Sequence, residues 1–131
     1  MGKIAKTETV ILCDDIREEI RNKRSLMGIY PDKVVVKRVA ITLPKICLYM
    51  GLAGIKRKFE KINVTLKLPK LMPHSFDLKQ HTCVKLGEDI SVGIIVSPFK
   101  IQNQGNACFE LRLDDDKKPS LIYKFRILVE E

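Results

Sequence analysis

The stretch FEKINVTLKL, residues 59–68, decides the fold class of this chain. Apolar side chains stand at every second position, namely Ile62, Val64, Leu66 and Leu68. The positions between them hold Lys61, Asn63, Thr65 and Lys67. An alternation of period two places the apolar residues on one face of an extended chain, so this segment is predicted to be a half-buried β-strand.

The same alternation returns further along the chain. Cys108–Leu113 places Phe109, Leu111 and Leu113 inward and Glu110 and Arg112 outward, and Tyr123–Val129 alternates in the same way after a turn at Asp114–Pro119. Three β-prone or apolar segments precede the decisive stretch, at residues 7–13, 34–36 and 44–52. Residues 91–101 form another such segment, which Pro98 interrupts. We read Gly51–Lys58 as a turn or loop because it holds two glycines and a basic run.

Residues 14–30 are predicted to form a hairpin around Asn22-Lys23, because Asn tolerates the positive φ of a tight turn. A short helix from Asp15 is the alternative, since Asp15-Ile16-Arg17-Glu18 also fits a capping box. With turn signals recurring between short strands, the sequence predicts an all-β fold, an antiparallel β-sandwich of about seven to nine strands. Residues 1–131 are predicted to form a single domain.

Composition and cysteine placement favour a cytoplasmic protein. The longest uncharged apolar stretch, Ile46–Ile55, has about half the length that a membrane helix needs, and the N-terminal residues show no signal-peptide core. No membrane partner is therefore expected. The four cysteines lie far apart without metal-binding spacing and are expected to be small buried hydrophobes in a reducing compartment: Cys13, Cys47, Cys83 and Cys108.

Positive charge is concentrated in the first half of the chain. Residues 1–70 carry 16 Lys and Arg against 7 Asp and Glu, while residues 71–131 carry 8 against 9. The candidate anion-binding residues form three groups: Arg21, Lys23 and Arg24; Lys37 and Arg38; and Lys56, Arg57, Lys58 and Lys61. Such groups attract phosphates, but a single-strand binder also interleaves aromatic side chains for stacking, and only Tyr30 and Phe59 lie close.

Candidate catalytic and metal sites are incomplete. Asp14 and Asp15 form a candidate functional turn, and they would make a cation site only if the fold brought Asp114-Asp115-Asp116 beside them. His81 and Cys83 are two residues apart, without a third group to orient them. Because no glycine-rich phosphate loop is present either, we assign no catalytic, metal-binding or cofactor-binding residue and expect no cofactor.

The segments ILCDDIREE (11–19), NK (22–23) and SLMGIY (25–30) resemble the opening of a family of small uncharacterised bacterial proteins. The resemblance covers about the first 30 residues. It implies a bacterial, intracellular, compact β domain without an assigned activity. This chain departs from the family in the number of basic residues at its turn, which are Arg21, Lys23 and Arg24.

The favoured function is that of a non-enzymatic interaction domain. Its partner would be another protein or a second copy of the chain, bound by pairing along an edge strand. The alternative is an anion-binding or nucleic-acid-binding module that uses the basic first half.

Overall fold

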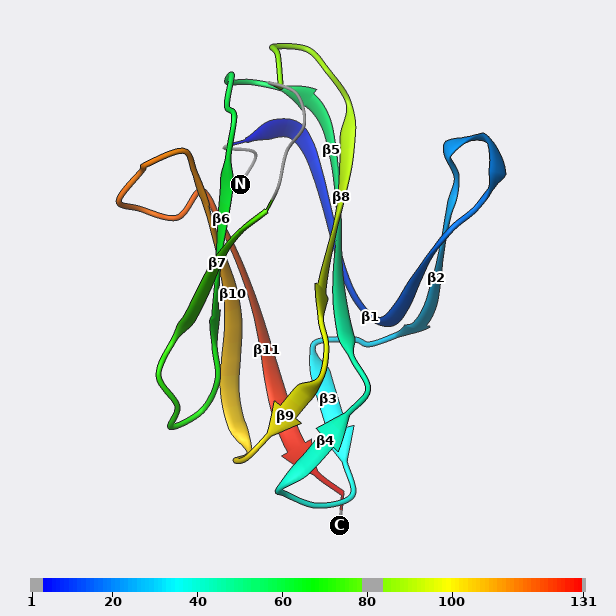
Figure 1. Cartoon of the computed structure of the whole chain (residues 1–131), viewed down its shortest axis with the longest axis vertical. Coiled ribbons are helices and arrows are strands. Elements are labelled where there is room, and N and C mark those ends of the chain that lie inside the picture. The colour runs from blue at the N-terminus through cyan, green and yellow to red at the C-terminus, as the bar shows by residue number, and fades with distance from the viewer. Residues whose placement is uncertain (1–3, 79–83, 131) are drawn as a thin grey trace.

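The computed structural model describes residues 4–78 and 84–130 and shows a β-sandwich, which confirms the predicted fold class (Figure 1). Eleven strands lie in these ranges, more than predicted, because two of them are only three residues long. One sheet has four strands in the order β2-β1-β5-β8. Its strands are β1 (Ala5–Glu18), β2 (Arg24–Ile29), β5 (Ile46–Ile55) and β8 (Ile90–Val96).

The second sheet has five strands in the order β3-β11-β10-β6-β7. Its strands are β3 (Lys33–Val36), β6 (Ile62–Lys67), β7 (His74–Leu78), β10 (Gly105–Leu113) and β11 (Leu121–Val129). Every pairing in the two sheets is antiparallel except β3 with β11, which run parallel. A small ribbon of β4 (Ile41–Leu43) and β9 (Phe99–Ile101) lies at the lower end of the sandwich (Figure 1).

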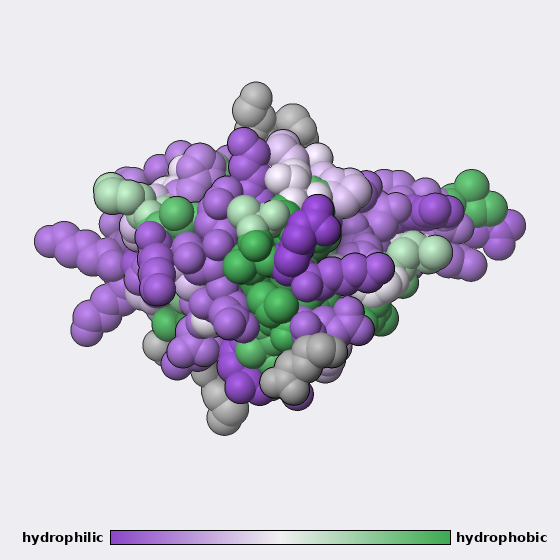
Figure 2. All heavy atoms as spheres, turned by 90° about the horizontal axis from the view of Figure 1, so that it is seen from below, coloured by the Kyte–Doolittle hydropathy of each residue, from purple (hydrophilic) through white to green (hydrophobic). Residues whose placement is uncertain are grey.

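The core lies between the two sheets. The decisive stretch contributes Ile62, Val64 and Leu66, all buried, and Phe109 and Phe125 stack beside them with ring centroids 5.9 Å apart. Burial of these side chains follows the predicted alternation, since their neighbours along each strand point outward. Seen from below, hydrophobic side chains remain visible between the charged surfaces of the sandwich (Figure 2).

One local prediction differs from the structure. Residues 51–55 continue strand β5 instead of forming a loop, because β5 pairs with β1 on one side, and with β8 on the other as far as Leu52. Glu110 points away from the core as predicted, yet it is only 8% exposed because Lys67 and Arg112 flank its carboxylate.

The hairpin prediction is confirmed. β1 and β2 pair antiparallel, and a single 3-10 turn, η1 (Ile20–Asn22), joins them. The positive φ of 62° falls on Arg21 rather than on Asn22. Among the described residues there is no helix long and apolar enough to cross a bilayer.

Candidate protein-binding arm

The hairpin extends beyond the sandwich as a two-stranded arm, residues 14–29. β1 pairs with β5 from Ala5 to Cys13, and from Asp15 to Glu18 its one strand partner among the described residues is β2. Figure 1 shows the arm bending away from the four-stranded sheet and standing apart from it. Because a two-stranded hairpin is marginally stable alone in water, the arm needs anchoring contacts at its base.

Asp14 provides the first anchor. Its carboxylate accepts a hydrogen bond from the hydroxyl of Tyr30, the residue that follows β2. This bond closes the base of the hairpin. Gly28 lies beside it with a φ of +64°, and a Cβ built there would be 2.8 Å from the Asp14 Cγ. Only glycine suits both this backbone conformation and this close approach. Burial and the Asp14 hydrogen bond raise the pKa of Tyr30.

Asp15 provides the second anchor. It forms ion pairs of 2.6 Å with Lys45 Nζ and 3.4 Å with Arg17 Nε, and Lys45 lies just before β5. These hydrogen bonds, that of Lys45 first, hold the pKa of Asp15 below its ordinary value. The Asp15–Lys45 pair therefore ties the arm to the sandwich.

Cys13 and Cys47 lie under the base of the arm. They are direct partners across β1 and β5, and both are fully buried. The Cys13 thiol donates to the Asp15 carbonyl oxygen at 3.5 Å, and the Cys47 thiol donates to that of Asp14 at 3.7 Å. Burial raises the pKa of both thiols, that of Cys13 to about 11, so neither is an activated nucleophile.

Two side chains of the arm reach back toward strand β8. A Cβ built on Gly93 would be 3.2 Å from Ile16 Cδ1 and 4.0 Å from Arg24 Nη1, so the absence of a side chain at position 93 gives Ile16 room beside the strand. Arg24 pairs with Glu18 at 3.1 Å through its Nε atom. Its buried Nη1 atom has no hydrogen-bond partner among the described residues.

The rest of the arm exposes apolar side chains to solvent. Ile20 at the tip is 80% exposed, and Met27 and Ile29 on β2 are 44% and 60% exposed. Figure 2 shows the arm projecting at the right, with hydrophobic side chains near its end. An exposed apolar group on a projecting element is typical of a surface that a partner covers.

The edge of β2 is also open. Glu19 N donates to Lys23 O, so by the antiparallel pattern the amides of Ser25 and Met27 also face β1, whereas those of Arg24 and Leu26 face away. No further strand pairs with β2 in the described part of the chain. The side of the strand that faces away therefore presents backbone donors and acceptors to solvent.

The other sheet edges carry the protective features that natural proteins use. β3 follows Pro31-Asp32, and β7 follows Pro73. β8 ends before Pro98 and begins after Glu88-Asp89. Proline and charge discourage pairing at an edge; Lys23 and Pro31 also flank β2, but within the strand Arg24 is the one charged residue.

The structure does not gather the predicted anion-binding residues into one surface. Arg21, Lys23 and Arg24 lie at the tip of the arm, Lys37 and Arg38 follow β3, and the remaining four belong to the connection between β5 and β6. Figure 1 places these three segments at the right, the bottom and the top of the molecule.

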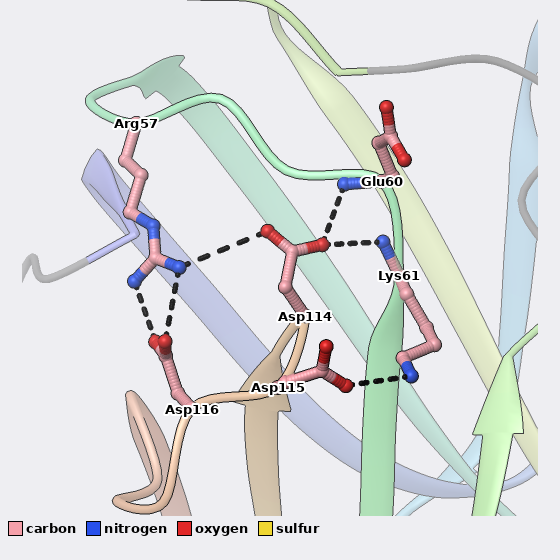
Figure 3. Close-up of polar contacts among 6 residues, drawn as sticks. All are labelled: Arg57, Glu60, Lys61, Asp114, Asp115 and Asp116. Atoms are coloured by element: carbon pink, nitrogen blue, oxygen red, sulfur yellow. Dashed lines mark hydrogen bonds and ion pairs between the residues drawn. The ribbon is translucent and has the colours of Figure 1, made fainter.

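Two of the four cations in the β5–β6 connection are held by acids of the β10–β11 turn (Figure 3). Arg57 forms a bidentate pair with Asp116 at 2.5 and 3.2 Å, and Lys61 Nζ lies 3.2 Å from Asp115. Asp114 accepts hydrogen bonds from the backbone amides of Glu60 and Lys61, at 2.9 and 3.1 Å. These contacts form a structural clasp between two connections.

The two acidic runs are not brought together. The side chains of Asp14 and Asp15 contact Tyr30, Arg17 and Lys45, whereas those of Asp114–Asp116 contact Arg57, Glu60 and Lys61. No cluster of three metal-ligating side chains occurs in residues 4–78 and 84–130. Asp14 and Asp15 also lie within strand β1, so the expected functional turn is instead the point where the arm leaves the sheet.

The remaining thiols and imidazoles show no catalytic arrangement among the described residues. His81 and Cys83 lie outside the described residues. Cys108 is half-buried on the outer face of the five-stranded sheet.

Sequence reasoning missed the exposed apolar residues of the arm and the role of Lys45. The run Ser25-Leu26-Met27-Gly28-Ile29 was the available signal, because its apolar residues do not alternate with polar ones. Such a run places apolar side chains on both faces of a strand, and one of the two faces must then lie outside the core.

Comparisons with known proteins give little further information. No protein-family model matches the chain, and no curated protein matches it. A solved structure of a β-glucosidase from Listeria innocua, in complex with isofagomine, aligns with 95% of this chain and 17% of its own, at a TM-score of 0.36 and 11% identity. The chain thus spans about a sixth of that enzyme's length, and a likeness this weak supports no argument about function.

Proposed function

We propose that this chain is a non-enzymatic protein-binding domain and that its arm is the binding element. The observation that carries the proposal is the open edge of β2 beside the exposed side chains of Met27 and Ile29. An extended segment of a partner protein would pair with this edge, and its apolar side chains would cover those of β2. The domain would be cytoplasmic, where its thiols remain reduced.

The anchors at the base support the proposal. A binding strand loses affinity when it must be ordered during binding, because the ordering costs conformational entropy. Asp14 and Asp15 fix the arm to Tyr30 and Lys45 before any partner arrives. The arm is therefore preorganised for strand addition.

Nucleic-acid binding has less support. Its candidate cations are spread over three segments, and Arg57 and Lys61 are paired with acids of the clasp. Stacking aromatics do not accompany them in the described residues, since Phe59 is buried and the Tyr30 hydroxyl is bonded to Asp14. Absorbance that is typical of nucleic acid in the purified protein, lost after a high-salt wash, would reverse this preference.

Amide hydrogen exchange tests strand addition directly. Peptides selected for binding from a display library would be added to the labelled protein, and exchange would be followed residue by residue. We expect the amides of Arg24 and Leu26 to exchange quickly in the free protein and slowly in the complex. Those of Ser25 and Met27 already face β1 and should be protected in both states.

Charged substitutions on the two exposed edge strands provide a test variant and its matched control. The double variant Met27→Lys and Ile29→Lys places charge on the exposed apolar surface of β2 and should weaken peptide binding at least tenfold. Val35→Lys alters a side chain that is 55% exposed on β3, the edge of the other sheet, and should leave binding unchanged. Equal effects of the two variants, or unchanged exchange at Arg24 and Leu26, would contradict the proposal. Protection that grows with protein concentration alone would identify a second copy as the partner.

A further inference from the structure

A second candidate site lies on the five-stranded sheet, away from the arm. β10 carries the short side chains of Asn106 and Cys108 on the outer face of this sheet. Cross-strand pairing places Lys67 of β6 and Lys124 of β11 on either side of Cys108, and it places Arg126 opposite Asn106. Short side chains between long ones leave a depression, which we call the trough.

The trough has the size of a small-molecule site. Its volume is about 530 Å³, within the range of roughly 300–1,000 Å³ that is usual for ligand pockets. Leu68 also lines it, so it offers apolar as well as polar surface. A nucleic-acid strand needs an extended groove, whereas this volume suits one compact molecule.

The charge of the trough is positive and partly uncompensated. Lys67 is bonded to the buried Glu110 at 2.9 Å, and Arg112 occupies the other oxygen of that carboxylate at 3.0 Å. Lys124 and Arg126 form no ion pair or side-chain hydrogen bond within the described residues. Asp32 is the one acid among the residues that line the trough.

The fixed side chains explain how the site keeps its shape. Because Glu110 holds Lys67, the β6 wall of the trough has a defined position. Lys124 and Arg126 form the opposite wall, and their side-chain N–H donors have no partner among the described residues. An Arg guanidinium can bind two oxygens of one phosphate at once, and a neighbouring Lys supplies a second positive charge.

From this arrangement we infer that the trough binds a small organic anion, specifically a phosphate monoester. Lys124 and Arg126 would bind the dianionic phosphate, and the organic group would lie over the apolar surface near Leu68. This site is independent of the arm, because the two lie on different sheets. Its failure or success therefore leaves the proposed function unaffected.

Phenyl phosphate is a suitable probe, since it combines one dianionic phosphate with one small apolar ring. Titration into the ¹⁵N-labelled protein should give saturable shifts of the backbone amides of Asn106, Cys108, Lys124 and Arg126. Phenol, which has the ring without the phosphate, should cause no saturable shifts at these amides. Binding of phenol equal to that of phenyl phosphate would overturn the inference.

A matched pair of variants separates a defined site from general attraction to a basic protein. Lys124→Gln with Arg126→Gln removes both unpaired cations and should weaken phenyl phosphate binding at least tenfold. Lys117→Gln with Lys118→Gln removes the same charge from the exposed β10–β11 turn and should change affinity less than twofold. All four side chains are exposed, so both variants should keep the dispersed spectrum of the folded protein.

Two further results would overturn the inference. One is equal weakening in both double variants, which would show that net charge alone attracts the probe. The other is tighter binding of a single-stranded oligonucleotide with the same dependence on Lys124 and Arg126, which would assign the cations to a polyanion instead.

Discussion

Asp14 fills the space beside Gly28 that a Cβ would otherwise occupy. Gly28 has a φ of +64°, and a Cβ built on it would lie 2.8 Å from the Asp14 Cγ. The strand that forms the exposed edge of the arm is therefore fixed by an acid from the neighbouring strand. Any side chain at position 28 must both accept the left-handed backbone and displace the carboxylate that binds Tyr30.

Gly28→Ala is expected to lower the free energy of unfolding by about 2–3 kcal/mol, because backbone strain and steric displacement add. Urea denaturation measures the loss. Gly87→Ala is the matched control, since Gly87 has a φ of +82° with no atom within 4 Å of its added Cβ. That variant should lose only about 1 kcal/mol from backbone strain. Equal losses in the two variants would show that Asp14 moves aside without cost.

Where a strand alternates, the sequence predicted the structure well. The alternation of residues 62–67 and of the strands around Phe109 and Phe125 determines which side chains enter the core, because a register shift of one residue would expose them. The glycines at positions 51 and 54 led to the wrong prediction of a loop where β5 continues. Pairing with β1 continues through both of them to Ile55, and such pairing overrides the weak local preference of glycine.

The candidate sites depend on relationships that one strand cannot reveal. The hairpin was predictable. Its projection from the sandwich was not, because it depends on the point at which β1 stops pairing with β5, at Cys13. The trough needs the register that sets Lys67 and Lys124 on either side of Cys108. Residues far apart in sequence define these arrangements, and local periodicity carries no information about them.

Rising pH should destabilise the protein through Cys13. Burial raises the pKa of this thiol from its ordinary value of 9.0 to about 11. The unfolded state therefore loses its proton first, and stability falls as the pH rises between these two values. We expect Cys13 to contribute a loss of roughly 2–3 kcal/mol across this window.

Urea denaturation at pH 7.5 and pH 10.5 measures this contribution. Cys13→Ala should lower the stability at both pH values, because it removes buried sulfur, but it should show a smaller difference between them. Cys47 and Tyr30 also have raised pKa values, so part of the alkaline loss should remain in the variant. An unchanged pH difference in Cys13→Ala would contradict the prediction.

Asp114 should contribute more to stability than the other acids of the clasp. Its carboxylate accepts hydrogen bonds from two backbone amides, and its φ of 52° suits Asp better than Ala. Asp114→Ala should therefore cost about 1–3 kcal/mol in urea denaturation. Asp114→Asn keeps one acceptor oxygen and tolerates the backbone, so it should recover most of the loss.

Asp115→Ala is the control for the clasp, because the Asp115 side chain is 97% exposed and forms one ion pair with Lys61. Exposed pairs contribute little, so this variant should remain close to the original stability. A loss in Asp115→Ala as large as that in Asp114→Ala would show that charge, rather than the backbone hydrogen bonds, holds the clasp.

Glu110 should make the protein sensitive to acid. The hydrogen bond from Lys67, followed by that from Arg112, lowers the pKa of this buried carboxyl group. Its stabilising contribution is therefore present above the unfolded pKa of about 4.3 and is lost as the pH falls through the folded pKa. Glu110→Gln should lower stability at pH 7 by about 1–3 kcal/mol and reduce the further loss on acidification. Urea denaturation at pH 7 and pH 3 measures both effects, with the exposed Glu130→Gln as control. An acid response in Glu110→Gln as steep as in Glu130→Gln would show that the Lys67–Glu110–Arg112 contacts do not depend on the carboxylate charge, and the wall of the trough would then need another explanation.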